Sequence, residues 1–456
     1  MLKAAFTTAA WYEVSAECLT PIRTGGIDND PETLLMTKRL TPVRTGGNGV
    51  GAEAVFMDAQ PVLLLQGSSL AGALRGWLEE NGGNADALFG SSAVEGKICP
   101  GRLRVSDGEF LPETETALRP RLKLNPKTRA AENDKKFDMA HIQTGARFNF
   151  RLIWLGEEAQ TDELETVERM LSALHNWEIR LGAQKNNGFG RVSLRYRKRV
   201  YRLSDEKDRR DWLDKSPPDG IPVTPEALAD NRRVRFTLRF RADSLLVKAG
   251  TEDFAEEGED GKPSMVTVSM TEAGRAVIPG SSVKGAVRAR AEQIAALKGL
   301  PIEETESLFG RMARRDNDNG IAGVVRFEDI RLPDEKRVRV KRIRINRFTG
   351  GVVTSGLFTE DTVSTSVPAE LRVSIPANRE RGCALLLYAL RDLAWNLYGL
   401  GSGRSIGRGN LDASELEIRL PGGGTALFRF RDGFRCEASG EVETVQGWLA
   451  GLEAKA

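Results

Sequence analysis

The chain has 456 residues, and its 66 lysines and arginines nearly balance 64 aspartates and glutamates, for a formal net charge of +2. With 40% hydrophobic and 29% charged residues, the composition is that of a globular protein and excludes an intrinsically disordered one. The sequence shows neither a membrane-spanning apolar segment nor the apolar core of a signal peptide, so we expect a cytoplasmic protein without membrane contact. Because the net charge is small, any site for a polyanion must be a local patch.

Scarce cysteines and histidines restrict the chemistry further. The four cysteines lie far apart and form none of the close pairs of a zinc site or redox motif, which favours buried thiols at Cys18, Cys99, Cys383 and Cys436. The only histidines are His141 and His175, so a mechanism with an imidazole base and an imidazole acid would need both.

The first half of the chain contains a helix-start motif, Gly-Ser-Ser at residues 67–69, followed by apolar residues at helical spacing. Serines can cap free backbone N–H groups there, and small residues let a phosphate approach the positive end of the helix. Capping alone and phosphate binding are both open interpretations of this motif. A second helical periodicity over residues 164–181 leads into a glycine loop at residues 188–190.

The middle of the chain marks a domain boundary. Residues 204–231 are rich in charge and proline, and we expect them to link two domains. Beyond them, residues 234–240 alternate apolar and polar side chains, as in a β-strand with one buried face. The predicted domains span residues 1–203 and 232–421, and the tail 422–456 is expected to add one more strand and an amphipathic helix.

The motifs of the first half return in the second half in the same order. The repeated pairs are residues 67–75 with 280–288, 125–137 with 346–358, and 188–190 with 407–409. Their offsets are nearly constant, from 213 (280 minus 67) to 221 (346 minus 125), which indicates duplication of a whole domain. Within each copy the order strand, helix, strands, helix, strand predicts an α+β fold, that is, tandem ferredoxin-like (RRM-like) domains.

Several segments suit contact with RNA. The glycine-rich segment 399–409 combines small residues with Arg404 and Arg408, which fits a phosphate-lined backbone. It lacks the Gly-Lys-Ser/Thr ending of a P-loop, which excludes an ATPase of that type. Basic runs with strand-like alternation favour RNA contact over a merely solvated sheet surface. These runs lie at residues 195–202, 232–241 and 337–345.

Taken together, the Gly-Ser-Ser-x-x-Gly-Ala-x-Arg, Leu-Phe-Gly, Asn-Arg-Phe-Thr-Gly-Gly and glycine-loop motifs resemble the RAMP superfamily of CRISPR-associated proteins, specifically backbone subunits of type III effector complexes. The resemblance covers residues 5 to 418 and implies RAMP domains with thumb-like β-hairpin insertions at residues 125–148 and 346–371. It also implies a ribonucleoprotein of antiviral defense whose partners are CRISPR RNA, target RNA and other CRISPR effector subunits.

The resemblance places RNA contacts at the repeated motifs. In the first copy these are Gly67, Ser68, Ser69, Arg75, Lys185 and Arg191, and in the second copy Gly280, Ser281, Ser282, Lys284, Arg288, Arg347, Arg404 and Arg408. Ala71 stands where the second copy has Lys284, so the first helix start has one phosphate ligand fewer.

Similar subunits cut target RNA with an aspartate in the loop between the first strand and the Gly-Ser-Ser helix, aided by a divalent metal. The carboxylate candidates here are Asp28 and Asp30 in the first copy and Asp253 and Asp260 in the second. We favour Asp28 and Asp30 as ligands of Mg²⁺ or Mn²⁺, because carboxylates bind hard cations. Two alternatives stay open: a non-catalytic structural subunit that binds CRISPR RNA, and a histidine-dependent endoribonuclease that processes precursor CRISPR RNA.

Overall fold

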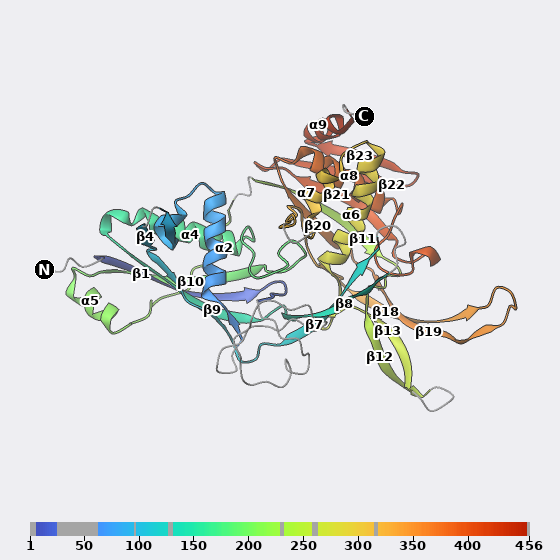
Figure 1. The fold of residues 1–456 in the computed structure, drawn as a ribbon, viewed down its shortest axis with the longest axis horizontal. Coiled ribbons are helices and arrows are strands. Elements are labelled where there is room, and N and C mark those ends of the chain that lie inside the picture. The colour runs from blue at the N-terminus through green and yellow to red at the C-terminus, as the bar shows by residue number, and fades with distance from the viewer. Residues whose placement is uncertain are drawn as a thin grey trace. The chain divides into compact units, whose positions relative to one another are not determined.

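The computed structural model describes residues 6–24, 63–94, 97–125, 131–228, 232–257, 263–313 and 318–453 (Figure 1). The chain divides into two compact units. The first comprises residues 1–124, 130–185 and 189–228, and the second comprises residues 125–129, 186–188 and 229–456.

The first unit is built on an antiparallel sheet with the strand order β10-β1-β9-β6-β2, in which β5 also pairs with β9. Its strands are β1 (Thr8–Cys18), β2 (Leu64–Leu65), β5 (Leu103–Val105), β6 (Gly108–Phe110), β9 (Arg147–Gly156) and β10 (Val192–Arg202). The helices α2 (Gly67–Glu80) and α4 (Asp162–His175) lie between strands in the sequence. This is the predicted ferredoxin-like order, with the first strand between the third and the fourth.

The side chains of β1 alternate between the two faces of the sheet, and the buried ones show which face the two helices cover. Tyr12, Val14 and Ala16 point into a core that they share with Leu74 of α2 and Leu171 of α4. The odd-numbered residues of β1 therefore point to the opposite, open face of the sheet.

The second unit repeats this plan. Its central strands have the order β16-β20-β11-β21, and the Gly-Ser-Ser helix α6 and the helix α8 pack into one core with β11. These elements are β11 (Arg233–Ala242), α6 (Gly280–Leu297), β16 (Arg326–Phe327), β20 (Ala369–Pro376), α8 (Glu380–Ala394) and β21 (Leu411–Arg419). The predicted α+β class with two ferredoxin-like domains is confirmed.

The C-terminal tail forms two strands and a helix, one strand more than expected. β22 (Thr425–Arg431) pairs with β21, β23 (Arg435–Gly440) pairs with β22, and α9 (Val442–Glu453) follows. Val445, Trp448 and Leu452 of α9 are buried in the core of the second unit. The tail is therefore an integral part of this unit.

Residues 204–231, expected as a linker, contain the helix α5 (Glu206–Leu213), and residues 204–228 group with the first unit. Trp212 of α5 packs edge-on against Trp11 of β1, with ring centroids 6.4 Å apart. The hydroxyl of Tyr201 donates to the carbonyl of Ser216 at 2.6 Å and holds the end of this segment against β10.

Each unit carries a long antiparallel hairpin, as the resemblance implied. The first hairpin is β7 (Thr116–Leu124) with β8 (Ala131–Ile142), and the second is β18 (Glu335–Ile345) with β19 (Val352–Thr365). Figure 1 shows β18 and β19 extending away from the sheet of the second unit. The predicted bounds were wrong at both ends: the segments 125–148 and 346–371 miss the first strand of each hairpin and run on into β9 and β20.

Short elements complete the two units. In the first these are α3 (Ala85–Phe89), β3 (Gly90–Val94), β4 (Lys97–Pro100) and η1 (Glu158–Gln160). In the second they are β12 (Lys248–Glu257), β13 (Pro263–Ser269), β14 (Thr271–Glu272), β15 (Arg275–Ile278), α7 (Ile302–Phe309), β17 (Ile330–Arg331) and η2 (Arg404–Ile406).

Candidate nucleic-acid interface

The Gly-Ser-Ser motifs start helices in both units, and an aspartate caps each start. The amide of Gly67 donates to Oδ1 of Asp107 at 2.6 Å, and the amide of Gly280 donates to Oδ1 of Asp329 at 2.7 Å. A carboxylate is favourable there because of the unpaired N–H groups and the positive end of the helix dipole. A Cβ atom on Gly67 would lie 2.7 Å from the carbonyl oxygen of Val105, so close strand packing explains the glycine.

These caps limit what the helix starts offer to a phosphate. The amides of both predicted glycines are already bonded inside the protein. Ser68, Ser69 and Ser282 are exposed, and Ser281 is half-buried. The serines, rather than the glycine amides, are therefore the groups of this motif that can meet RNA.

The arginines that close the Gly-Ser-Ser motifs have an internal partner that is the same in both units. Nη1 of Arg75 donates to the carbonyl of Gly90 at 2.7 Å, and Nη1 of Arg288 donates to the carbonyl of Gly310 at 2.9 Å. The two glycines are those of the Leu-Phe-Gly motifs. Each arginine therefore joins its helix to the Leu-Phe-Gly turn, which explains why the two motifs occur together.

The glycine loops also repeat a backbone arrangement. The amide of Leu181 donates to Gly190 at 2.9 Å, and that of Leu400 donates to Gly409 at 3.0 Å. Gly190 and Gly409 have φ values of 89° and 75°, and a Cβ on either would lie within about 2.2 Å of the leucine carbonyl oxygen. These glycines are thus required by the fold of the loop, whatever the loop binds.

Two predicted RNA contacts in these loops are buried. Arg191 is 8% exposed, and its guanidinium lies 3.5 Å from the ring centroid of Trp177. Arg408 is 7% exposed, and its Nη1 lies 2.6 Å from Oε2 of Glu360. Burial and these partners argue against direct phosphate contact for both arginines.

The remaining predicted cations are closer to the surface. Lys185 and Arg347 are exposed, and Lys284 and Arg404 are half-buried. Nη1 of Arg404 lies 3.4 Å from the carbonyl of Gly399, within its own loop.

The β18–β19 hairpin presents both cationic and apolar side chains. Asn346 sits at its tip, where its Oδ1 accepts hydrogen bonds from the amides of Phe348 and Thr349 at 2.9 and 3.3 Å. Phe348 is 85% exposed and lies under the guanidinium of Arg347, at 4.9 Å from the ring centroid. An exposed aromatic ring beside a cation is suited to stacking on a base.

The same hairpin neutralises part of its own basic run. Nε and Nη2 of Arg339 bind the two carboxylate oxygens of Asp361 at 2.8 and 2.9 Å. The guanidinium holds the pKa of the Asp361 carboxyl below its usual range. Arg342 pairs with Glu360 at 2.8 Å. The cationic surface is therefore smaller than the run of arginines predicts.

Exposed apolar side chains mark both hairpins. Besides Phe348, they are Leu118, Leu122, Leu124 and Phe137 on β7–β8, and Val338, Ile343, Ile345, Val352, Leu357 and Phe358 on β18–β19. Exposed apolar side chains gathered on one element are a feature of binding surfaces.

Of the four predicted catalytic carboxylates, the structure describes the backbone of one, Asp253. Asp28, Asp30 and Asp260 lie outside the described residues. The segment expected as the acidic loop of the second copy is instead a hairpin of β12 and β13, in which Asp253 is paired with Met265. Among the described residues, no group of three or more histidines, cysteines, aspartates and glutamates is placed to hold a metal ion.

Both histidines serve the interior of the first unit. Nδ1 of His175 accepts the amide hydrogen of Leu194 at 3.1 Å. His141 is 1% exposed, with its ring centroid 5.6 Å from that of Phe189. Among the free cysteines, Cys18 and Cys383 are buried as expected, whereas Cys436 is exposed.

Sequence reasoning missed the two capping aspartates. Their signal is a short repeat, Arg-Val-Ser-Asp ending at Asp107 and Arg-Phe-Glu-Asp ending at Asp329, which are 222 residues apart (329 minus 107). Only the geometry shows that each carboxylate meets a Gly-Ser-Ser helix.

Comparison with known families agrees with the duplicated geometry. The sequence profile of the RAMP superfamily matches residues 15–193 and again residues 244–412. The chain belongs to the RAMP superfamily. The two matches correspond to two fused RAMP copies, and membership supports a CRISPR-associated role in RNA binding. A comparison with curated proteins finds no match.

The RAMP copies carry the repeated motifs, and the tail lies beyond the second match. In the described part of the chain, no helix combines the length and apolar character needed to cross a membrane.

Proposed function

We propose that this RAMP protein is a double-length backbone subunit of a type III CRISPR effector complex. Each copy holds a stretch of CRISPR RNA, and the hairpins β7–β8 and β18–β19 contact the guide and its target. The observation that supports this most is the recurrence of one arrangement in both copies: capped Gly-Ser-Ser helix, tight glycine loop and a hairpin with exposed apolar side chains.

The contacts assigned to RNA are those with accessible groups. The exposed serines of the helix starts can donate to phosphate oxygens, Lys185 and Arg347 supply charge, and Phe348 offers a stacking face. Such contacts position a backbone and do not read its sequence. The guide supplies sequence specificity through base pairing.

The test is the RNA content of the complex purified from its native host. We expect the preparation to contain CRISPR RNA, and binding to weaken steeply with salt because phosphate contacts release condensed counterions. A complex free of RNA would refute the function.

Cleavage of target RNA is the second part of the proposal. Asp28 and Asp30 of the first copy would hold a divalent ion, Mg²⁺ or Mn²⁺, and Asp253 and Asp260 are the candidates of the second copy. A bound cation can stabilise charge at the cleaved phosphodiester. The Asp28→Asn/Asp30→Asn double variant is expected to keep CRISPR RNA and lose target cutting. If the assembled complex of this variant still cuts target RNA, the catalytic assignment fails and the alternative of a purely structural subunit is favoured.

Processing of precursor CRISPR RNA is the weaker alternative. Nδ1 of His175 already accepts a backbone amide and His141 is buried, so neither imidazole is poised for acid–base work on a bound RNA. Cleavage of precursor RNA by the isolated chain in EDTA would favour this alternative.

A further inference from the structure

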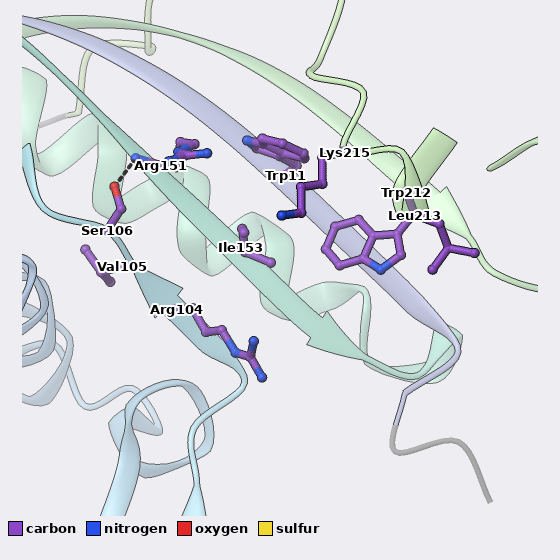
Figure 2. A pocket seen from close by; sticks show the side chains of 9 residues that line it. All are labelled: Trp11, Arg104, Val105, Ser106, Arg151, Ile153, Trp212, Leu213 and Lys215. Carbon is purple, nitrogen blue, oxygen red and sulfur yellow. Dashed lines mark hydrogen bonds between the residues drawn. The ribbon is translucent and has the colours of Figure 1, made fainter. Parts of the chain in front are cut away.

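The open face of the first unit's sheet, opposite α2 and α4, carries a pocket of about 520 Å³ (Figure 2). Its size falls within the range of small-molecule sites, roughly 300–1,000 Å³. The lining residues are Trp11, Arg104, Val105, Ser106, Arg151, Ile153, Trp212, Leu213 and Lys215. All of them belong to the first unit.

Strand register explains why these side chains meet. Ile153 of β9 is paired with Trp11 of β1 on one side and with Arg104 of β5 on the other, so the three form a row across the sheet. Arg151 lies two residues before Ile153 and on the same face. Trp212 enters from α5, the helix inside the segment expected as a linker. Figure 2 shows Trp11 between Arg151 and Trp212, with its nitrogen-bearing edge towards Arg151.

Trp11 carries an unused hydrogen-bond donor. The residue is 6% exposed, and its buried Nε1 has no hydrogen-bond partner among the described residues. A buried indole N–H without an acceptor costs free energy comparable to a lost hydrogen bond. Because this nitrogen is closed to solvent, Trp11 presents the indole ring to the pocket rather than its N–H group.

The cations of the pocket are also uncommitted. No hydrogen bond or ion pair joins the side chains of Arg104, Arg151 or Lys215 to another described residue, and both arginines are exposed. Glu13 is paired with Arg151 across the strands. Two arginines of β10 on this face are engaged: Arg199 binds Asp208 and Asp211, and Arg197 binds the carbonyl of Gly220.

The second unit provides an internal contrast on the same face of its sheet. Arg239 on the open face of β11 pairs with Glu370, Glu415 and Glu417. Carboxylates therefore neutralise that face, whereas the cations of the first unit converge on a hollow with two indoles.

We propose that this pocket binds one nucleotide of single-stranded RNA, with the base against the indole rings of Trp212 and Trp11 and the adjoining phosphate on Arg104, Arg151 and Lys215. The proposal rests on the RNA-binding function proposed above and adds a contact on the face opposite the Gly-Ser-Ser helix. RNA is favoured over an acidic peptide because a peptide would use the cations and leave the indoles without a role. Aromatic side chains on the open face of a four-stranded sheet are a recurrent platform for bases.

The test uses the full chain and an eight-nucleotide oligouridylate containing one 4-thiouridine. After irradiation, we expect a crosslink on the peptide that contains Trp212 or on the one that contains Trp11. Anisotropy titrations at several KCl concentrations then compare variants. We expect Trp212→Ala to weaken binding by roughly five- to a hundredfold.

Arg104→Gln/Arg151→Gln tests the pocket without a risk to folding, because neither side chain has an internal partner. It is expected to lower the slope of log affinity against log salt by about 0.7 for each phosphate that the variant no longer neutralises. Arg202→Gln is the matched control, because Arg202 is 70% exposed on β10 and does not line the pocket. It should bind as the wild type does.

Three results would overturn the proposal. One is wild-type binding by the Arg104/Arg151 variant without a crosslink in the pocket, and another is stronger competition by an octaglutamate peptide than by unlabelled RNA. In both cases, loss of binding in a Phe348→Ser variant would leave the proposed function standing. If the wild type binds no RNA at all, the proposed function fails together with the pocket.

Discussion

At the scale of single residues, repeated motif positions divide into those that build the fold and those that face outward. Arg75 and Arg288 reach the carbonyls of Gly90 and Gly310. A repeated arginine in an RNA-binding family invites assignment to phosphate contact, yet its partner here is a backbone turn. The exposed serines of the same motifs, in contrast, are not part of the core.

The structural role of Arg288 can be separated from a role in RNA binding. Arg288→Ala removes the hydrogen bond to Gly310 and the ion pair with Glu292, and it should destabilise the second unit by ~1–2 kcal/mol. The salt dependence of RNA affinity should stay unchanged. Thermal unfolding and salt titrations of the variant check this, with exposed Arg275→Ala as the control. A shallower salt slope without loss of stability would instead assign Arg288 to RNA.

The Arg339–Asp361 pair predicts an acid-sensitive hairpin. Because the guanidinium lowers the pKa of Asp361 in the folded protein, the pair stabilises the hairpin above the unfolded-state pKa of about 3.9. That contribution is lost as the pH falls through the still lower pKa of the folded state. In Arg339→Gln the pKa should rise towards the unfolded value.

A carbon-13 NMR titration of aspartate carboxyl groups measures this shift. Arg202→Gln serves as the charge-matched control, since it removes an exposed arginine away from Asp361. An unchanged Asp361 pKa in Arg339→Gln would contradict the assigned cause.

At the scale of elements, the two hairpins carry exposed apolar side chains that the packing of the fold does not require. Leu122, Phe137 and Phe348 are all exposed, although each lies on an element with enough strand pairing to be ordered. Their side chains contribute little to the core. Burying them against a partner would therefore add favourable free energy to binding.

Phe348→Ser should therefore separate stability from binding. At 85% exposure, loss of the ring is expected to change the free energy of unfolding by at most about 0.5 kcal/mol. RNA affinity should fall by roughly five- to a hundredfold if the ring stacks on a base. Phe434→Ser, at 63% exposure in the tail, is the matched control. Equal affinities for both variants would remove Phe348 from the interface.

Elements defined by local patterns were predictable from sequence, and those defined by distant contacts were not. The helix begins at Gly67, where the Gly-Ser-Ser motif placed it. The first strands of the hairpins were missed because the Asn motifs mark the tips rather than the starts. Trp212 was missed because its place in the pocket depends on packing against Trp11, which is far away in the sequence. The burial of Arg191 and Arg408, which argues against phosphate contact, cannot be read from their charge in the sequence.

At the scale of the whole molecule, the chain is one module present twice, with the copies diverged in detail. The capping aspartate, the arginine of the Gly-Ser-Ser motif and the glycine loop make the same contacts in both copies. The open sheet faces differ, since glutamates surround Arg239 in the second copy while Arg104 and Arg151 of the first line a pocket. Under the proposals above, duplication followed by such divergence would give the chain RNA contacts in both copies and one further contact in the first copy only.

The most direct test of this account is ultraviolet crosslinking of the native complex, followed by mass spectrometry of RNA-bound peptides. The account predicts crosslinks to CRISPR RNA in both hairpins, β7–β8 and β18–β19, within the same preparation. Crosslinks confined to one copy, or a complex without RNA, would contradict the claim that both copies bind the guide.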